Sequence, residues 1–265
     1  MEIKNSLTIG QYVPADSIIH KLDPRTKLIS VLFFMVIIFL IESLVGYLIL
    51  LLLICLLIVI SRVQFKYFIR GLRPILILIV FTVFLQLFFT KGTPLVSVLG
   101  LVITKEGVNL AIFIFLRLVL LVFSSSLLTL TTSPMELTSA LEWILYPFKV
   151  FGLPSSEISM MMTIALRFIP TILEETDRLM KAQMARGADF ESGGLFKRIQ
   201  NMVPILVPLF ISAFRRADEL AIAMEARCFQ VGAKRTHLKE LCFNKRDYFF
   251  LLFFISIIII VSFIF

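Results

Sequence analysis

Long apolar runs separated by basic stretches constrain this sequence more than any other feature. The runs cover residues 28–60, 74–89, 107–130 and 248–265. A membrane-spanning helix needs about 20 predominantly apolar residues, and the cytoplasmic loops of membrane proteins carry an excess of Lys and Arg. The runs, and a net charge of +8 that lies mostly between them, therefore predict an integral membrane protein. They exclude a soluble enzyme, a disulfide-rich secreted module and a disordered tail, and no nucleic-acid binding is expected.

The first run is too long for a single span. At about 1.5 Å per residue, residues 28–60 would form a helix about 50 Å long, whereas the hydrocarbon core is about 30 Å thick. Glu42 and Ser43 interrupt the run, so we expect a hairpin there. Basic residues mixed with aromatic ones at 62–73 indicate an interfacial helix before the next span. The predicted spans are 28–41, 44–60, 74–89, 107–130 and 248–265.

The distribution of charge predicts the orientation. With five spans, 23 Lys and Arg residues fall on one side of the membrane and 2 on the other. The positive-inside rule makes the rich side cytoplasmic, so we expect a cytoplasmic N-terminus and an external C-terminus. The fold expected is an all-α polytopic membrane protein with about five transmembrane helices and long cytoplasmic helices. Its regions are an N-terminal membrane region of about four spans at 1–131, a cytoplasmic region at 132–246 and a C-terminal transmembrane helix at 247–265.

The cytoplasmic region contains two long helical stretches, 155–186 and 196–227, that each begin apolar and end charged. Their apolar parts have 15 and 13 residues, fewer than the roughly 17–25 that a span needs. We expect them to lie at the membrane interface or to pack on protein. Pro204 and Pro208 should bend or break the second helix.

A shorter helix is predicted at 135–150, before the two long ones. Ser133 and Glu136 have the spacing of a capping box, in which each side chain binds the other residue's backbone amide. Pro134 stands at the first helical position, which proline favours. These residues mark the start of the helix.

The two long helices end alike when the sequence is offset by 41 residues. Five of ten positions in 177–186 and 218–227 are identical, including a final Ala-Arg. Arginine in a last turn can bind carboxylates or carbonyls of a partner, and small alanines allow close approach. The helix dipole would explain Arg186 or Arg227 alone, and an ordinary helix end would explain Gly187. The identical Asp, Leu and Ala positions favour binding to two similar partners, because helix capping does not require these matches.

The segment from Arg167-Phe168-Ile169-Pro170 to Ala185-Arg186-Gly187, with the second ending Ala226-Arg227-Cys228, resembles the transmembrane coupling (T) component of energy-coupling factor transporters. The resemblance covers nearly the whole chain, and the paired Ala-Arg endings are its most specific part. It implies that the two long helices are coupling helices, each seated in one of two ABC-type ATPases. The residues that would contact the ATPases are Ala185, Arg186, Gly187, Ala226, Arg227 and Cys228. Cys228 departs from the usual Gly, which leaves open a different ending or seating of the second helix.

The same resemblance implies a function. The chain would be the transmembrane scaffold of an ATP-driven importer of a vitamin or metal ion, as a multi-pass protein in a prokaryotic cell membrane. It would couple ATP hydrolysis by the ATPases to movement of a separate membrane-embedded substrate-binding (S) subunit. Met160, Met161 and Met162 form a soft surface on which that subunit would dock, with ordinary packing as the alternative. No P-loop motif occurs in the sequence, so we expect no catalytic site and no cofactor in this chain, with ATP and magnesium bound by the ATPases.

Two other functions are weighed against this one. A stand-alone secondary transporter favours an internally repeated membrane region, whereas the repeat here lies in the cytoplasmic region. An intramembrane enzyme would need a cluster of acidic, His or Cys residues, and the chain offers only Glu174, Glu175 and Asp177. We interpret these as solvated carboxylates paired with basic residues at helical spacing. Arg117, a charge inside the fourth span, is either functional or a snorkelling side chain that binds neighbouring carbonyls.

Overall fold

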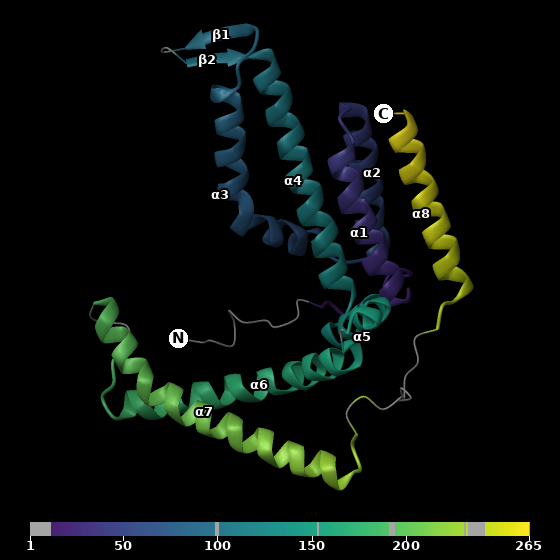
Figure 1. Ribbon diagram of the computed structural model, residues 1–265. Helices are drawn as coiled ribbons and strands as arrows, with labels where there is room; N and C mark the ends of the chain where they lie inside the picture. The colour runs from purple at the N-terminus through teal and green to yellow at the C-terminus, as the bar shows by residue number, and fades with distance from the viewer. Residues whose placement is uncertain are drawn as a thin grey trace. The chain divides into compact units, whose positions relative to one another are not determined.

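The computed structural model describes residues 12–98, 101–152, 154–190, 194–230, 232 and 242–264. Its helices are α1 (Pro24–Leu40), α2 (Leu44–Ser61), α3 (Phe65–Phe89), α4 (Lys105–Thr131), α5 (Pro134–Leu145), α6 (Ser155–Ala185), α7 (Leu195–Ala226) and α8 (Lys245–Ile264) (Figure 1). A short 3₁₀ helix, η2 (Tyr146–Phe151), follows α5. Two strands, β1 (Pro94–Val98) and β2 (Leu101–Thr104), lie between α3 and α4. The protein is thus an almost entirely helical polytopic membrane protein, as the sequence predicts.

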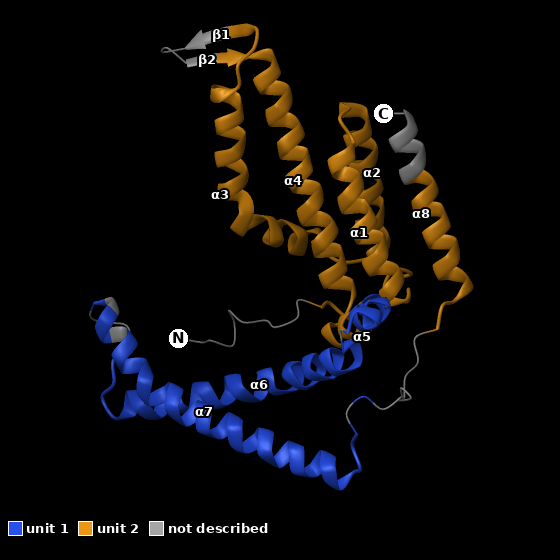
Figure 2. Ribbon diagram, in the orientation of Figure 1, with its two compact units in different colours: residues 1–8, 141–238 blue, residues 9–140, 239–265 orange. Residues whose placement is uncertain are grey.

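The chain divides into two compact units, which Figure 2 colours separately. One unit contains residues 9–140 and 239–265, and therefore α1 to α4 together with α8. The other centres on residues 141–238 and contains η2, α6 and α7. The boundary between the units falls within α5. The last apolar helix therefore belongs to the same unit as the N-terminal membrane region.

The predicted hairpin between the first two spans is confirmed. α1 ends at Leu40 and α2 begins at Leu44, on either side of Glu42 and Ser43. The Ser43 side chain accepts a hydrogen bond from the Gly46 amide at 3.1 Å. This bond satisfies one of the backbone donors that the first turn of a helix leaves free.

The interfacial helix and the third span, predicted as separate elements, form one helix in the structure. α3 continues through Pro74. Proline has no amide hydrogen and its ring crowds the preceding turn, so it kinks a helix that tertiary packing keeps intact. Figure 1 shows α3 bent into two limbs.

An antiparallel hairpin separates α3 from α4, although the sequence analysis predicts no strand. β1 pairs with β2, with Pro94 opposite Thr104. The many β-branched residues in both strands favour an extended backbone. Thr104 then caps α4, because its hydroxyl accepts a hydrogen bond from the Gly107 amide at 3.1 Å and donates one to the Thr90 carbonyl at 2.9 Å. The end of α3 and the start of α4 are therefore joined through one side chain.

The capping box at the start of α5 is confirmed. The Ser133 amide donates to the Glu136 carboxylate at 3.2 Å, and the Glu136 amide donates to the Ser133 hydroxyl at 3.3 Å. The α-helix ends at Leu145, earlier than predicted, and continues as η2. Pro147 lies in the first turn of η2, where its missing amide hydrogen would interrupt an α-helix.

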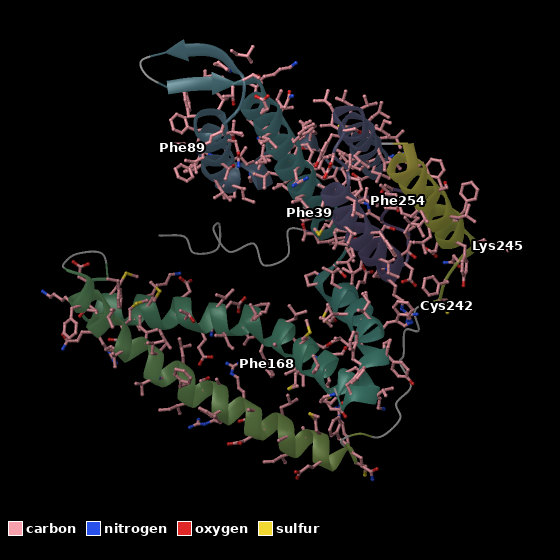
Figure 3. All side chains as sticks on the ribbon, turned by 45° about the horizontal axis from the view of Figure 1, so that its top comes forward. Phe39, Phe89, Phe168, Cys242, Lys245 and Phe254 are labelled. Atoms are coloured by element: carbon pink, nitrogen blue, oxygen red, sulfur yellow. The ribbon has the colours of Figure 1, made fainter. Side chains whose placement is uncertain are left out.

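The core of the unit that contains α1 to α4 and α8 lies around α4, which packs against α1, α2 and α3. Phe34 of α1, Leu50 of α2, Phe68 of α3 and Leu120 of α4 are each at most 1% exposed. Phe254 of α8, labelled in Figure 3, completes the core with its ring centroid 6.1 Å from that of Phe34. Four different helices and α8 thus share one apolar interior.

Long apolar side chains also cover the outside of these helices. Phe39 and Phe89, both labelled in Figure 3, are 59% and 72% exposed. Exposed apolar surface on this scale marks a site of contact with lipid or protein. Lipid contact is what spans in a bilayer require.

Four helices of the described chain are long and apolar enough to cross a membrane, namely α2, α3, α4 and α6. The first three coincide with predicted spans. The sequence also predicts α1 and α8 as spans; they have 17 and 20 residues and are not among these four. It places α6 on the cytoplasmic side instead, because the apolar part of this helix is short and contains Arg167. The number of five spans and the location of α6 stay predictions.

Arg117 of α4 is held by two other helices. Its Nε donates to the Tyr47 hydroxyl at 3.0 Å, and that hydroxyl donates to the Ile38 carbonyl at 2.9 Å. The guanidinium carbon lies 5.1 Å from the centre of the Phe39 ring, which is the range of a cation–π contact. These contacts favour a structural role for Arg117, since they tie α4 to α1 and α2.

Polar contacts join α1, α4 and α8 at one end of the unit. Asp247, in the first turn of α8, is 1% exposed and accepts hydrogen bonds from the backbone amides of Asp23 and Asn244, each at 2.8 Å. Lys27 of α1 is also buried and donates to the Thr131 carbonyl, at the end of α4, at 2.9 Å. The start of the last helix is therefore fixed to the start of the first.

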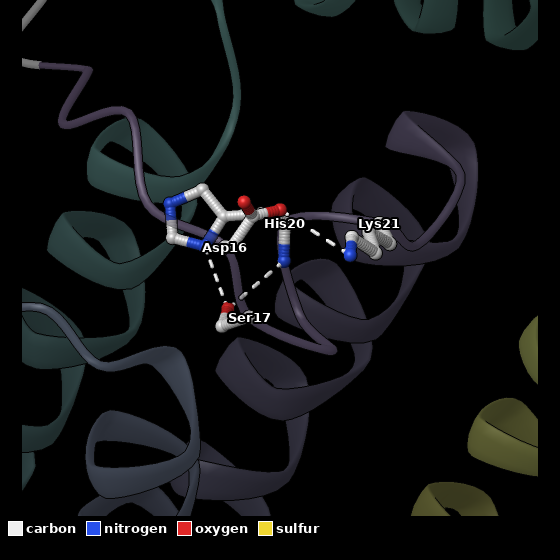
Figure 4. Close-up of polar contacts among 4 residues, drawn as sticks. All are labelled: Asp16, Ser17, His20 and Lys21. Atoms are coloured by element: carbon white, nitrogen blue, oxygen red, sulfur yellow. Dashed lines mark hydrogen bonds and ion pairs between the residues drawn. The ribbon is translucent and has the colours of Figure 1, made fainter.

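Local contacts hold the segment before α1 (Figure 4). The Nε2 atom of His20 donates to the Val13 carbonyl at 3.0 Å, so Nδ1 accepts the Ser17 hydroxyl hydrogen at 2.6 Å. Burial lowers the pKa of His20 and favours the neutral ring that this pattern requires. Lys21 and Asp16 form an exposed ion pair at 3.2 Å.

Candidate functional site

α6 and α7 are helices of 31 and 32 residues in the unit that centres on residues 141–238. They run in opposite directions in Figure 1, so their C-terminal ends lie at opposite ends of the pair. α7 remains helical through Pro204 and Pro208, and Figure 1 shows its first turns inclined to the rest. The two prolines thus bend the helix without breaking it, one of the two predicted outcomes.

α6 ends in a Schellman motif. The Gly187 amide donates to the Met184 carbonyl at 2.9 Å, and the Ala188 amide donates to the Gln183 carbonyl at 2.9 Å. Gly187 has φ = 87°, in the left-handed region that glycine adopts without a steric penalty. Arg186 precedes it as the C-cap residue.

α7 ends in the same motif. The Cys228 amide donates to the Glu225 carbonyl at 2.9 Å, and the Phe229 amide donates to the Met224 carbonyl at 3.0 Å. Cys228 has φ = 56°, where an L-residue with a side chain is strained by about 1–2 kcal/mol. Cys228 therefore takes in α7 the position that Gly187 takes in α6, and the type of helix ending is the same. It adds backbone strain.

Substitutions at these two positions should change the stability of the helix ends in opposite directions. Gly187→Ala places a side chain on left-handed backbone, and because an added Cβ meets no atom within 4 Å, its cost of about 1 kcal/mol is conformational. Cys228→Gly removes such strain. We expect the Ala188 amide to exchange hydrogen about fivefold faster in Gly187→Ala. The Phe229 amide should exchange more slowly in Cys228→Gly. Hydrogen exchange read by mass spectrometry measures both, and unchanged exchange in both variants would contradict the assignment of strain.

The residues predicted to contact ATPases are all exposed, namely Ala185, Arg186, Gly187, Ala226, Arg227 and Cys228. Neither guanidinium has a hydrogen bond or ion pair in the part of the chain that the structure describes. Each guanidinium offers five N–H donors in a fixed planar arrangement. The two helix ends therefore present equivalent donor groups to whatever lies beyond them.

Two of the clustered carboxylates of α6, Glu175 and Asp177, form ion pairs. No group of three His, Cys, Asp or Glu side chains in the described residues could hold a metal ion. Asp177 pairs with Lys181, four residues on, at 2.9 Å, as the helical spacing predicts. Glu175 instead binds Arg216 of α7 at 2.9 Å. This second pair has no local signal in the sequence, because its members are 41 residues apart in the chain.

The predicted methionine surface is only partly exposed. Met161 is 58% exposed, while Met160 and Met162 are half-buried. A larger apolar stripe lies on α7, whose exposed members include Phe196, Ile199, Val203, Val207, Phe210 and Phe214. The spacing of three, four and seven residues places these side chains on one helix face. We call this face the α7 stripe, and its exposure makes it a second candidate contact surface.

Comparison with known proteins gives the family of this chain. The model of the CbiQ family, described as cobalt transport protein, matches residues 15–238. The energy-coupling factor transporter transmembrane protein EcfT of Clostridium kluyveri is 54% identical over 244 residues, which cover 91% of this chain and 90% of that protein. Proteins of the same name from Thermosediminibacter oceani and Brevibacillus brevis are 52% and 50% identical, with 91% of this chain and 91% and 92% of those proteins covered. The chain is an energy-coupling factor T component.

Membership of the T component family confirms the resemblance seen in the sequence. The family match includes both Ala-Arg endings, the α7 stripe and the methionine surface. It indicates no catalytic enzyme family, and it makes this T component a multi-pass membrane subunit of a transporter. Which residues of the T component bind which partner stays a prediction.

Proposed function

We propose that this T component is the scaffold through which two ABC-type ATPases move a membrane-embedded substrate-binding subunit. The single observation that carries the proposal is the pair of exposed arginines, Arg186 and Arg227, on two helix ends with the same hydrogen-bond motif. Two equivalent ends suit two equivalent grooves, which a pair of related ATPases would supply. The flanking small residues at each end permit close approach of a groove wall.

The α7 stripe supplies the second half of the proposal. Val207 and Phe210 are 52% and 62% exposed, and water is an unfavourable neighbour for such side chains. The substrate-binding subunit covers the stripe, with Met161 as an adaptable neighbour that suits exchange of one such subunit for another. Closure of the ATPases on ATP binding moves the two helix ends, and the long helices pass that motion to the docked subunit.

The sequence contains no P-loop. In this proposal the partner ATPases bind ATP and magnesium, and their hydrolysis of ATP supplies the energy. The substrate is a micronutrient, a vitamin or a metal ion, and the substrate-binding subunit selects it. The excess of Lys and Arg in 132–246 supports a cytoplasmic location for this region and for the N-terminus, in a prokaryotic cell membrane.

A pull-down of the intact chain from its native membranes in gentle detergent tests this function. Mass spectrometry should identify two P-loop ATPases and at least one small membrane protein with it. Several alternative small membrane proteins would indicate a scaffold shared among substrates. Recovery of the chain alone, still transporting a solute after reconstitution, would overturn the proposal in favour of a stand-alone secondary transporter.

A further inference from the structure

One ion pair joins the two long helices. The Nη2 atom of Arg216 on α7 lies 2.9 Å from Oε2 of Glu175 on α6. Their side chains are 35% and 27% exposed, so both are partly withdrawn from water. Ile205, which is 5% exposed, lies three turns before Arg216 on the same face of α7. The face of α7 that meets α6 is thus separate from the exposed α7 stripe.

The two members of this pair are 41 residues apart, the same offset that aligns the two helix endings. Under that alignment Glu175 and Arg216 are equivalent positions. In two segments related by a two-fold axis, a contact between residues i and j is accompanied by a second contact between their equivalents. A contact between equivalent residues maps onto itself, so it lies on the axis. The Glu175–Arg216 pair is therefore the contact through which an approximate two-fold axis between α6 and α7 would pass.

This position makes the pair the midpoint between the two helix ends. Arg186 follows Glu175 by 11 residues, and Arg227 follows Arg216 by the same number. At about 1.5 Å per residue, each end lies about 16 Å along its helix from the pair. A rotation of either helix about this point therefore swings its end through an arc of the same radius.

We propose that Glu175 and Arg216 form the pivot of the two coupling helices, a positioning pair that fixes the separation of Arg186 and Arg227. The pivot itself does not depend on the proposed function, because the separation of the two helix ends is a property of this chain alone. Only its effect on transport rests on that function. The pair holds the angle between the helices. It does not hold the helices folded, since a partly exposed ion pair contributes little to overall stability.

The charges around the pivot allow a matched test. Arg215, beside Arg216, is exposed, and Glu174, beside Glu175, is exposed on the same turn of α6. Arg216→Glu would place two carboxylates against each other at the axis. The double variant Glu175→Arg with Arg216→Glu restores an ion pair of reversed polarity. Arg215→Glu makes the same charge change one residue away and serves as the control.

Spin labels at the two ends measure the pivot directly. Met184→Cys and Glu225→Cys, two exposed positions 41 residues apart, provide the label sites in a chain where Cys55, Cys228 and Cys242 are replaced by Ser. Pulsed electron paramagnetic resonance should give a narrow distribution of distances for the parent and for Arg215→Glu. Arg216→Glu should broaden or shift it, and the reversed pair should restore it. A distribution that Arg216→Glu leaves unchanged, or that the reversed pair does not restore, overturns the pivot.

Transport gives a second readout in the assembled complex. Substrate moved per ATP hydrolysed should fall several-fold in Arg216→Glu and recover with the reversed pair, while Arg215→Glu keeps the parent ratio. Failure of the parent chain to bind ATPases would refute the proposed function and leave the distance measurement intact. A changed distance distribution with an unchanged transport ratio would refute the role of the pivot in transport.

Discussion

Reversing the charge at both helix ends, Arg186→Glu together with Arg227→Glu, should abolish ATP-driven uptake while the protein stays in the membrane. Hydrogen bonds to a charged group contribute about 1.5–3 kcal/mol each, and the substituted carboxylates add repulsion wherever the arginines met acceptors. The loss of two such contacts amounts to about 3 kcal/mol or more, which is over 100-fold in affinity for the ATPases. Both residues are exposed, so the fold should tolerate the change.

Uptake of substrate by reconstituted vesicles, together with co-purification of the ATPases, measures this effect. The matched control is Arg178→Glu with Arg215→Glu, because both of these arginines are exposed on the same helices away from the ends. The control should retain uptake within about twofold, as surface substitutions usually do. Normal uptake by the Arg186 and Arg227 variant would refute the assignment of the helix ends as ATPase contacts.

Two acidic substitutions in the α7 stripe, Val207→Asp and Phe210→Asp, should release the substrate-binding subunit and leave the ATPases bound. Burying a large apolar side chain contributes about 1.5–3 kcal/mol, and a carboxylate at an apolar contact costs more still. The expected loss in affinity is at least 100-fold. Val207→Leu with Phe210→Leu keeps the surface apolar and should retain the subunit.

Co-purification separates the two contacts of the scaffold. The acidic variant should still bring down both ATPases, because the stripe and the helix ends occupy different parts of α7. Retention of the substrate-binding subunit by the acidic variant would show that another surface carries the docking. Loss of the ATPases as well would show that the stripe does not act independently of the ends.

Local signals in the sequence predicted the ends of elements well. Ser43 and the Ser133–Glu136 box act on backbone amides within three residues of themselves, so sequence spacing alone places them. It was harder to foresee that Cys228 would adopt the same left-handed backbone as Gly187 and end its helix in the same motif. An L-residue in left-handed backbone is unfavourable by itself, and the hydrogen bonds of the motif keep it there.

Contacts between distant segments lay beyond the sequence. Pro74 reads as a boundary in sequence, yet packing of α3 against α4 keeps the helix continuous and the proline becomes a kink. Glu175 has one basic neighbour a turn away, Arg178, which favoured a local pair, but the approach of α7 gives it Arg216. The role of Arg117 could not be assigned from the sequence either, because its hydrogen-bond partner Tyr47 comes from another helix.

The bond from the Asp23 amide to Asp247 has a consequence for the order of biosynthesis. Asp23 lies at the N-terminal end of α1, the first helix described, and its buried acceptor belongs to α8, which is translated after every helix that it completes. During synthesis the earlier helices can enter the membrane and pair, but the Asp23 amide keeps no buried partner until α8 arrives. The membrane unit therefore closes only after α8 has been synthesised.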